Sequence, residues 1–442
     1  MPGLQKEYDV IVVGGGGVNG LACAAYLQKA GLKVAVFERR DEVGTFCSTE
    51  ELMHPGVKVN IHASFIVAHI SPAFEELELR RFGYEPLTSS EWGRFHPFKD
   101  KSAVLWHSWD LRKQVEAWSR LSRKDGETLA KLANYLAPHW SDIAQTLMYS
   151  NPKPENMERV LHILDGCAVI PKGFQDMTGI EMADLMWEDE RIKVALLTGA
   201  IEGAAEPWEK GTGLTACILR VFWGAVFGVP YTAKGGSHGL PHALARCFVH
   251  YGGSLFQGCP VGKIIVENNE AKGVVLSKNA IYPDAEVHAK RGVVSNLTVQ
   301  PTFIDLVGLD KLSPEAARGV KMYEYDGQVL FTTYWVLNEA PQWPGYPPEI
   351  ARGFGFNFGE ESISDIFRLQ NDLIRGKLPD PPIASGGNCQ GYCMADPTQA
   401  PPGQFTVMSW CDVPYDLRRY GGPQAWDDLR ENYADKVEDL LN

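Results

Sequence analysis

The sequence lacks a long uninterrupted apolar run of the kind that crosses a membrane. Its most apolar stretch, residues 214–231, is 18 residues long and is broken by Arg220, Gly224, Gly228 and Pro230. A transmembrane helix needs about 20 consecutive apolar residues, so we expect a buried helix or a surface loop that dips into a membrane. The first residues also lack a basic flank followed by an apolar segment, so we expect no secretory signal.

Positive charge is also scarce. There are 42 Lys and Arg residues against 55 Asp and Glu, which gives a net charge of −13. A surface this negative repels phosphate backbones over most of its area, so we expect no nucleic-acid partner. With 45% apolar and 22% charged residues, the composition is that of a globular protein. A chain of 442 residues is long enough for two domains, whose segments can alternate along the sequence.

The cysteine pattern does not indicate disulfides or a metal site. There are nine cysteines, an odd number, scattered along the chain and often placed in apolar runs. We therefore expect reduced, mostly buried thiols and a cytoplasmic location. The one close pair, Cys389 and Cys393, has no second pair and no nearby histidine to complete a tetrahedral zinc site. We expect no metal from this pattern.

What the sequence does contain is a glycine-rich turn between a strand pattern and a helix pattern. The β-branched run at 8–13 predicts a strand and leads directly into GGGGVNG. Within that turn Gly15, Gly17 and Gly20 give the spacing G-x-G-x-x-G, and Ala24 follows. The first glycine permits a tight turn, the second lets the backbone approach a diphosphate, and the third lets the helix pack closely on the sheet.

The start of the predicted helix is suited to bind an anion. The N–H groups of Val18, Asn19 and Gly20 lie in its first turn, where the helix dipole favours negative charge. A second strand is predicted at 33–37 and ends at Glu38. That carboxylate is placed to accept hydrogen bonds from ribose hydroxyls and to repel a 2′-phosphate. The pattern predicts a dinucleotide site that disfavours NADP.

The residues after the second strand resemble a known family. Glu38, Arg39, Arg40 and Gly44 stand in ERRDEVG, which resembles the E-x-R-x-x-x-G-G segment of amine oxidases and phytoene desaturases, two branches of one FAD family. The resemblance implies that the dinucleotide is FAD and that this segment runs along its pyrophosphate and ribityl chain. Thr45 replaces the second glycine, so its side chain is expected to crowd the backbone near the cofactor and reshape the pocket slightly.

A second resemblance begins at residue 233. AKGGSHGLPHALARCFVHYGG is similar to the P-x-G-G segment and the following helix of phytoene desaturases. Strands are expected at 260–267, 271–276 and 291–297, the last with the Ser-Asn ending of the family at Asn296. The resemblance implies that backbone groups of Val261 lie against the adenine. The most similar group is the phytoene dehydrogenase-like proteins, which include carotenoid desaturases, carotenoid isomerases and retinol saturases.

One histidine is a candidate catalytic residue by the same resemblance. Residues 54–65 resemble the family stretch that reaches the flavin ring, which implies that His62 and Ala63 line the cofactor site. His62 stands where many relatives have glycine, and an imidazole can move a proton near neutral pH. The alternative is a structural histidine with satisfied hydrogen bonds. His238, in GGSHG, ranks second because its turn has a structural role in the family.

The expected fold class is α/β, with a Rossmann-like FAD-binding domain of the GR2 type and an interleaved α+β substrate domain. Apolar residues at helical spacing across 108–150 predict helices, and 327–337 reads as a strand. The expected boundaries are 1–70 and 232–306 for the FAD-binding domain, 71–231 for a mostly helical part of the substrate domain, 307–403 for its sheet part, and 404–442 for a return toward the FAD-binding domain.

The resemblance implies an FAD-dependent dehydrogenase or desaturase that transfers hydride from an apolar, isoprenoid-type substrate to flavin N5. Three alternatives remain: redox-neutral isomerisation of a polyene, an allylic oxidation that takes oxygen from water, and a non-catalytic FAD-binding subunit. Without a second Rossmann fingerprint, we expect a quinone, oxygen or a carrier protein as electron acceptor.

A partner chain is also expected. Relatives continue past a helix like 426–441 into a strand and a glycine-rich turn against the flavin, whereas this chain ends at Asn442. We therefore expect a second polypeptide to supply that segment, in a heteromeric enzyme. A water-insoluble substrate further implies peripheral contact with a membrane, for which 214–231 is the candidate segment.

Overall fold

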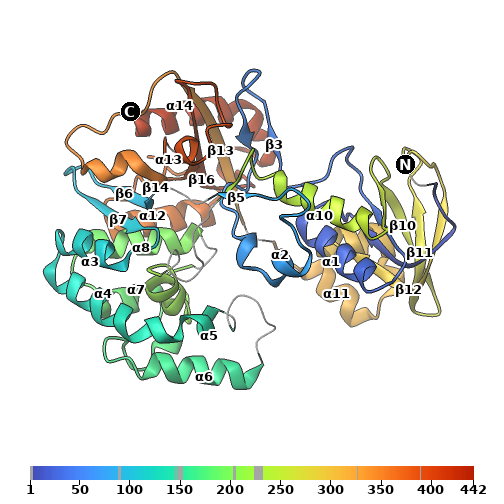
Figure 1. The fold of residues 1–442 in the computed structure, drawn as a ribbon, viewed down its shortest axis with the longest axis horizontal. Coiled ribbons are helices and arrows are strands. Elements are labelled where there is room, and N and C mark those ends of the chain that lie inside the picture. Colours follow the sequence, from blue (N-terminus) through green and yellow to red (C-terminus); the bar gives the residue numbers. More distant parts are fainter. Residues whose placement is uncertain are drawn as a thin grey trace. The chain divides into compact units, whose positions relative to one another are not determined.

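The computed structural model describes residues 3–87, 91–144, 146, 153–202, 206–222, 232–325, 327–388 and 390–442. The chain divides into two units, each built from separated segments (Figure 1). The first unit contains Met1–Glu50, Asn60–Pro86 and Thr232–Tyr325. The second contains Glu51–Val59, Leu87–Tyr231 and Asp326–Asn442. Among the described residues there are also two short ladders, β3 (Thr49–Glu50) with β4 (Val59–Asn60) and β5 (Pro86–Leu87) with β8 (Thr232–Ala233).

The first unit is built on a six-stranded sheet with the order β10-β11-β12-β1-β2-β9. The four strands from β12 to β9 are parallel, and β10 and β11 extend the sheet in antiparallel fashion. Short strands with few exposed residues are typical of a parallel sheet covered on both faces. The strands are β1 (Glu7–Val13), β2 (Val34–Phe37), β9 (Ser254–Phe256), β10 (Val261–Glu267), β11 (Glu270–Leu276) and β12 (Glu286–Ser295).

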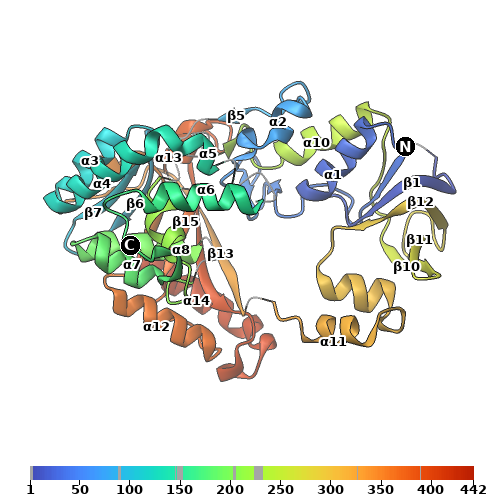
Figure 2. The ribbon, with the colours of Figure 1, turned by 90° about the horizontal axis from the view of Figure 1, so that it is seen from below.

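The two faces of this sheet bury different side chains. Val10 and Val12 of β1 join one apolar cluster, and Ile11 and Val13 join another, because successive side chains of a strand point to opposite faces. The first cluster includes residues of α1 (Val18–Lys29) and α10 (Gly239–His250). These two helices lie side by side in both views (Figure 1, Figure 2). The other α-helices described in this unit are α2 (Pro72–Glu76) and α11 (Pro314–Met322).

The strand predictions for this unit are confirmed, with one difference in length. The runs at 8–13, 33–37, 260–267 and 271–276 correspond to β1, β2, β10 and β11. The strand expected at 291–297 begins earlier, at Glu286, because its first half pairs with β11 and only its second half reads as an apolar run. Asn268 and Asn269, with φ of 50° and 63°, form the turn between β10 and β11, a conformation that asparagine tolerates.

The second unit contains a six-stranded mixed sheet with the order β13-β16-β15-β14-β6-β7. The predicted strand at 327–337 is confirmed as β13. The predicted helices across 108–150 are confirmed up to residue 144 as α3, α4 and α5, and residues 145 and 147–150 lie outside the described part of the chain. Its strands are β6 (Trp92–Pro97), β7 (Ala103–His107), β13 (Gln328–Leu337), β14 (Gly353–Phe358), β15 (Ala384–Asn388) and β16 (Phe405–Pro414). Its helices are α3 (Leu111–Ser119), α4 (Arg123–Leu136), α5 (Trp140–Ala144), α6 (Pro154–Asp165), α7 (Gly179–Met186), α8 (Glu190–Glu202), α12 (Ile363–Ile374), α13 (Gln390–Ala395) and α14 (Trp426–Leu441).

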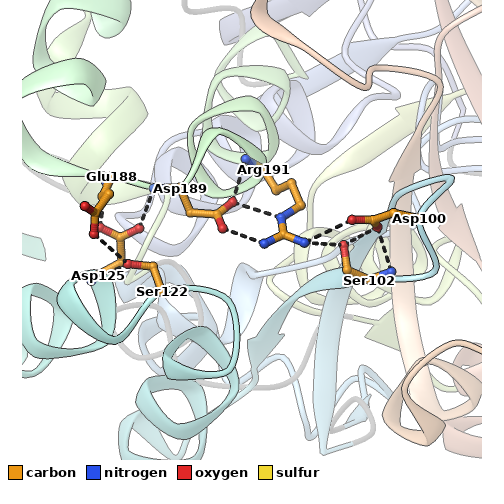
Figure 3. Close-up of polar contacts among 7 residues, drawn as sticks. All are labelled: Asp100, Ser102, Ser122, Asp125, Glu188, Asp189 and Arg191. Carbon is orange, nitrogen blue, oxygen red and sulfur yellow. Dashed lines mark hydrogen bonds and ion pairs between the residues drawn. The ribbon is translucent and has the colours of Figure 1, made fainter.

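A polar network fixes α4 and α8 in this unit (Figure 3). The fully buried carboxylate of Asp125 accepts the backbone N–H groups of Glu188 and Asp189 at 2.7 and 2.8 Å. Asp189 in turn pairs with Arg191 at 2.6 Å, and Arg191 reaches Asp100 at 3.1 Å in the turn between β6 and β7. The network therefore provides acceptors for backbone N–H groups at the start of α8 and connects this helix to α4 and to the sheet.

The division into units differs from the expected boundaries in four places. Residues 71–86 and 307–325 belong with the first unit, and residues 51–59 belong with the second. Residues 404–442, expected to return toward the FAD-binding domain, belong with the second unit. The physical reason is that β16 lies inside the second sheet, between β13 and β15, and that α14 buries Tyr433 and Val437 in the core of that unit.

The apolar stretch at 214–231 is only partly described. In residues 214–222 the side chains of Ala216, Cys217, Ile218, Val221 and Phe222 are buried in the core of the second unit. These side chains therefore pack in a protein core and not on a surface that faces a membrane. The remainder, 223–231, lies outside the described residues. Among the described helices, none combines the length and apolarity needed to cross a bilayer.

The described cysteines are free thiols in the structure. Six of them are buried: Cys167, Cys217, Cys247, Cys259, Cys393 and Cys411. Burial raises the pKa of the Cys47 thiol to about 11, which keeps it protonated and unreactive near neutral pH. Cys389 lies outside the described residues.

Candidate functional site

The residues of the predicted dinucleotide site meet at one edge of the first sheet. β1 lies between β2 and β12 and is parallel to both, so all three strands have their carboxyl ends at the same edge. Gly14, Glu38 and Asn296 are the residues that directly follow these three strands. Nucleotides bind at this edge in open parallel sheets, and the topology therefore places the candidate site here.

The three fingerprint glycines lie in close contact with neighbouring groups, most tightly at Gly15 and Gly20. A Cβ on Gly15 would lie 2.7 Å from the Val36 side chain, and one on Gly20 would lie 2.6 Å from the Cα of Gly15. A Cβ on Gly17 would lie 3.1 Å from the Thr45 hydroxyl. The glycines therefore allow close packing of the turn on β2, of α1 on the turn, and of the turn on the segment that carries Thr45.

The backbone N–H groups at the N-terminus of α1 have no acidic side chain of the first turn beside them. Gly17 caps the helix with no side-chain hydrogen bond, and the first turn contains no acidic residue. The first N–H groups of a helix need an acceptor from outside it. The donors at Val18, Asn19 and Gly20 therefore suit an entering diphosphate, which supplies both acceptor atoms and negative charge.

Glu38 is held at the edge of the sheet by two backbone N–H groups. Its carboxylate is 6% exposed and accepts the N–H of Gly16 at 2.9 Å and that of Arg40 at 3.0 Å. Each carboxylate oxygen keeps a further lone pair for a hydroxyl group. Arg39 and Arg40 are exposed, and Arg40 lies 4.0 Å from Glu50. Of these three side chains, the Glu38 carboxylate is therefore the one that the backbone holds in place at the sheet edge.

The segment after Glu38 is bonded directly to the glycine turn. Gly44 donates its N–H to the carbonyl of Gly16 at 2.9 Å and pairs with Gly17. Thr45 has a φ of 54°, in the left-handed region that a β-branched residue rarely adopts. Glycine, which the resembled E-x-R-x-x-x-G-G segment has at this position, adopts this conformation without strain. Thr45 adopts it with strain, and its hydroxyl faces Gly17.

His62 and Ala63 lie beside that same segment. The N–H of Ala63 donates to the carbonyl of Phe46 at 2.9 Å, and the rings of His62 and Phe46 are 5.1 Å apart. Burial lowers the pKa of His62, which keeps the imidazole neutral near pH 7 and able to accept a proton. The structure thus places His62 next to the residues expected along the cofactor.

Asn296 and Val261 come from the last strands of the unit. Asn296 donates its backbone N–H to Val13 at 2.9 Å, and its side chain reaches the carbonyl of Gly14 at 3.3 Å. Val261 follows Cys259, whose N–H donates to the carbonyl of Glu38 at 2.8 Å. Asn296 therefore lies at the turn, whereas Val261 begins β10 two residues after the contact between Cys259 and Glu38.

One buried residue that organises the site was not predicted from the sequence. Asn60 is fully buried, and its side-chain oxygen accepts the Thr49 hydroxyl at 2.8 Å and the N–H of Ser237 at 2.9 Å. His238, the next residue, places its Nε2 2.6 Å from the carbonyl of Val43. These contacts fix the P-x-G-G-like segment on the segment that carries Gly44, which supports a positioning role for His238.

Comparison with known proteins gives matches along most of the chain. A family described as FAD dependent oxidoreductase matches residues 9–356. The chain is 26% identical over 482 residues to pyridine nucleotide-disulfide oxidoreductase domain-containing protein 2 of Rattus norvegicus, covering 99% of this chain and 79% of that protein. It is 26% identical to a subunit of limonene dehydrogenase from Castellaniella defragrans, covering 98% of this chain and 78% of that protein.

Two further matches are more distant. The chain is 21% identical to phytoene desaturase (neurosporene-forming) of Cereibacter sphaeroides, covering 100% of this chain and 80% of that protein. Among solved structures, an oxidoreductase from Methanosarcina mazei matches with a TM-score of 0.59 and 19% identity, covering 99% of this chain and 84% of that one. The structural match supports the fold.

Proposed function

The chain belongs to the FAD dependent oxidoreductase family, and from this premise we propose that it is a dehydrogenase or desaturase of an apolar, isoprenoid-type compound. The expected resemblance to desaturase-like flavoproteins is confirmed by the matches to a limonene dehydrogenase and a phytoene desaturase. FAD is the cofactor. The names of these two relatives specify limonene and phytoene, both apolar isoprenoid hydrocarbons, and this supports the substrate class proposed for this chain.

The observation that carries the proposal is the glycine turn of β1 and α1, with Glu38 at the same sheet edge. We propose that Gly15, Gly17 and the N–H groups of Val18, Asn19 and Gly20 hold the diphosphate, and that Glu38 holds the ribose. Gly44, Thr45, Ala63, Val261 and Asn296 complete the cofactor site, with Arg39 and Arg40 at its exposed rim. When bound, FAD supplies the acceptor for a hydride.

His62 is the residue we propose for proton transfer. Removing hydrogen from two neighbouring carbons requires the loss of a proton as well as a hydride. A neutral imidazole can accept that proton, and burial keeps His62 in this state by lowering its pKa. In a His62→Gln variant we expect kcat to fall while the bound FAD content is unchanged.

We further propose that the enzyme is heteromeric. Support comes from a relative that is itself named as one subunit of a dehydrogenase. Native mass spectrometry of the untagged protein, purified from its own host, tests this point. A second polypeptide present in a fixed ratio supports the proposal, and a fully active species that contains this chain alone overturns it.

The test of function uses the protein purified with any companion chain. We expect a yellow protein whose flavin absorbance bleaches under anaerobic conditions when a cyclic monoterpene or a linear polyene is added. Product analysis then separates the possible reactions. A new double bond supports desaturation. A product of unchanged mass indicates isomerisation instead, and an oxygen atom derived from water indicates allylic oxidation. A flavin that no such compound reduces argues for a non-catalytic role.

The place of action is part of the same proposal. We propose a cytoplasmic protein that meets its substrate at a membrane surface, because water-insoluble hydrocarbons partition into lipid. Sedimentation with neutral liposomes that carry the substrate measures this contact. If the protein remains in the supernatant at every lipid concentration while it turns over the same substrate from micelles, the membrane contact is refuted.

A further inference from the structure

We propose that Glu42, His238 and His242 form a binding site for a divalent transition-metal ion of the zinc class. The three residues belong to the first unit and lie at the junction of the segment 38–47 with the start of α10. One candidate ligand atom from each lies within 4.8 Å of the others. The inference is independent of the function proposed above, because it concerns metal binding and not flavin chemistry.

The distances suit a metal ion of ordinary size. Nε2 of His242 is 3.2 Å and Nε2 of His238 is 3.8 Å from the same oxygen, Oε1 of Glu42. Two ligands of a tetrahedral zinc ion, at bond lengths of roughly 2.0–2.2 Å, lie about 3.3 Å apart. The three side chains therefore need only small rotations to surround one ion.

The helix supplies the two imidazoles in a fixed arrangement. His238 is the N-cap of α10 and His242 lies one turn later, so both rings are on one face of the helix. Their centroids are 4.1 Å apart and the rings are stacked. Two imidazoles and one carboxylate make a mixed nitrogen and oxygen donor set, which favours zinc, nickel or copper over magnesium or calcium.

Access and competing bonds are also compatible with a metal. Glu42 is exposed, and both histidines are partly exposed, so an ion can enter from solvent. His238 contacts the carbonyl of Val43 at 2.6 Å through the same Nε2 atom, and metal binding through that atom replaces this hydrogen bond. Three protein ligands leave the fourth position of a tetrahedral ion to water.

The site has a physical consequence for the cofactor segment. Glu42 lies two residues before Gly44, whose N–H bonds to the glycine turn. An ion held by Glu42 and by two residues of α10 links that segment to the helix across 200 positions of sequence. We therefore expect bound metal to stabilise the first unit against unfolding, since a ligand that binds only the folded state raises its stability.

The experiment uses the full chain, without a histidine tag, treated with EDTA and then titrated with Co²⁺ as a spectroscopic probe of the zinc site. We expect visible d–d bands of four-coordinate cobalt, displacement of Co²⁺ by Zn²⁺, and a thermal-unfolding midpoint that rises with metal. His242→Ala and Glu42→Gln each should weaken Co²⁺ binding by about tenfold or more. His250→Ala is the matched control, because His250 is a histidine of the same helix outside the cluster.

The outcomes are distinct. Loss of the cobalt bands in His242→Ala but not in His250→Ala supports the site. Absence of stoichiometric cobalt binding by the wild-type chain, or equal binding by His242→Ala, overturns it. Circular dichroism and flavin content are measured for each variant, and His242→Asn provides a second substitution if His242→Ala does not fold.

Discussion

The tight contact between α1 and the glycine turn makes a quantitative prediction for Gly20→Ala. The new Cβ would lie 2.6 Å from the Cα of Gly15 and 2.9 Å from its carbonyl oxygen. Both are backbone atoms, so no side-chain rotation can relieve the contact. Overpacking of this kind costs about 1–3 kcal/mol, and the better helix propensity of alanine offsets up to about 1 kcal/mol. Because both contacts are under 3.0 Å and involve backbone atoms, the cost falls in the upper part of that range, about 2–3 kcal/mol, and we expect a net loss of about 1–2 kcal/mol in the free energy of unfolding.

The same substitution should affect the cofactor more than the fold. Moving the start of α1 away from the turn displaces the N–H groups proposed to bind the diphosphate. Loss of one hydrogen bond to a charged group costs about 1.5–3 kcal/mol, so we expect FAD to bind about tenfold more weakly or worse. The assays are urea unfolding of the purified protein and the ratio of flavin to protein absorbance after gel filtration.

A second helical glycine provides the matched control. Gly319 lies inside α11, in the same unit, and a Cβ there would meet no atom within 4 Å. Gly319→Ala should therefore stabilise the protein by about 0.4–1 kcal/mol and leave FAD binding unchanged. If Gly20→Ala is as stable as Gly319→Ala and retains its flavin, the packing argument for the fingerprint is refuted.

Four further predictions concern single residues. Glu38→Gln should weaken FAD binding about tenfold or more, because an amide has only one acceptor oxygen; equilibrium dialysis measures it, and unchanged affinity would contradict ribose recognition by Glu38. Thr45→Gly should raise the unfolding free energy by up to about 1 kcal/mol, because relief of the strain at φ 54° exceeds the entropy cost of glycine; a lower melting temperature would count against that strain. Asp125→Ala should lower the free energy of unfolding by about 2–3 kcal/mol, because two backbone N–H groups lose their acceptor. Glu127→Ala, on the same helix, should change it little. Similar urea midpoints for the two variants would refute the role of the network. Burial raises the pKa of Glu360 to about 8 from its ordinary 4.5, so between these pH values the folded state retains a proton that the unfolded state releases. The free energy of unfolding should therefore fall by up to about 1 kcal/mol per pH unit as pH rises through this range. Glu360→Gln should remove this pH dependence, and an unaltered dependence would show that Glu360 is not its source.

Which parts of the candidate site could be predicted depends on how far apart in the sequence the interacting residues lie. The strand, turn and helix at 8–31 and the carboxylate at Glu38 follow from the order of residues over a short stretch, because hydrogen bonding and side-chain periodicity are local there. The same is true of the strand at 327–337 and the helix at 426–441. In contrast, the sequence did not predict the role of Asn60, because a buried asparagine can be identified only from the groups that it contacts.

By itself, then, the sequence determined the local elements, the glycine fingerprint and the resemblance that identifies FAD. Only the tertiary structure decided which distant residues join them: Asn296 beside Gly14, 282 positions away, and His242 beside Glu42, 200 positions away. It also decided that β16 pairs inside the second sheet. Such pairings depend on strand order and on the packing of whole elements, and a residue pattern within one segment contains no information about the partner segment.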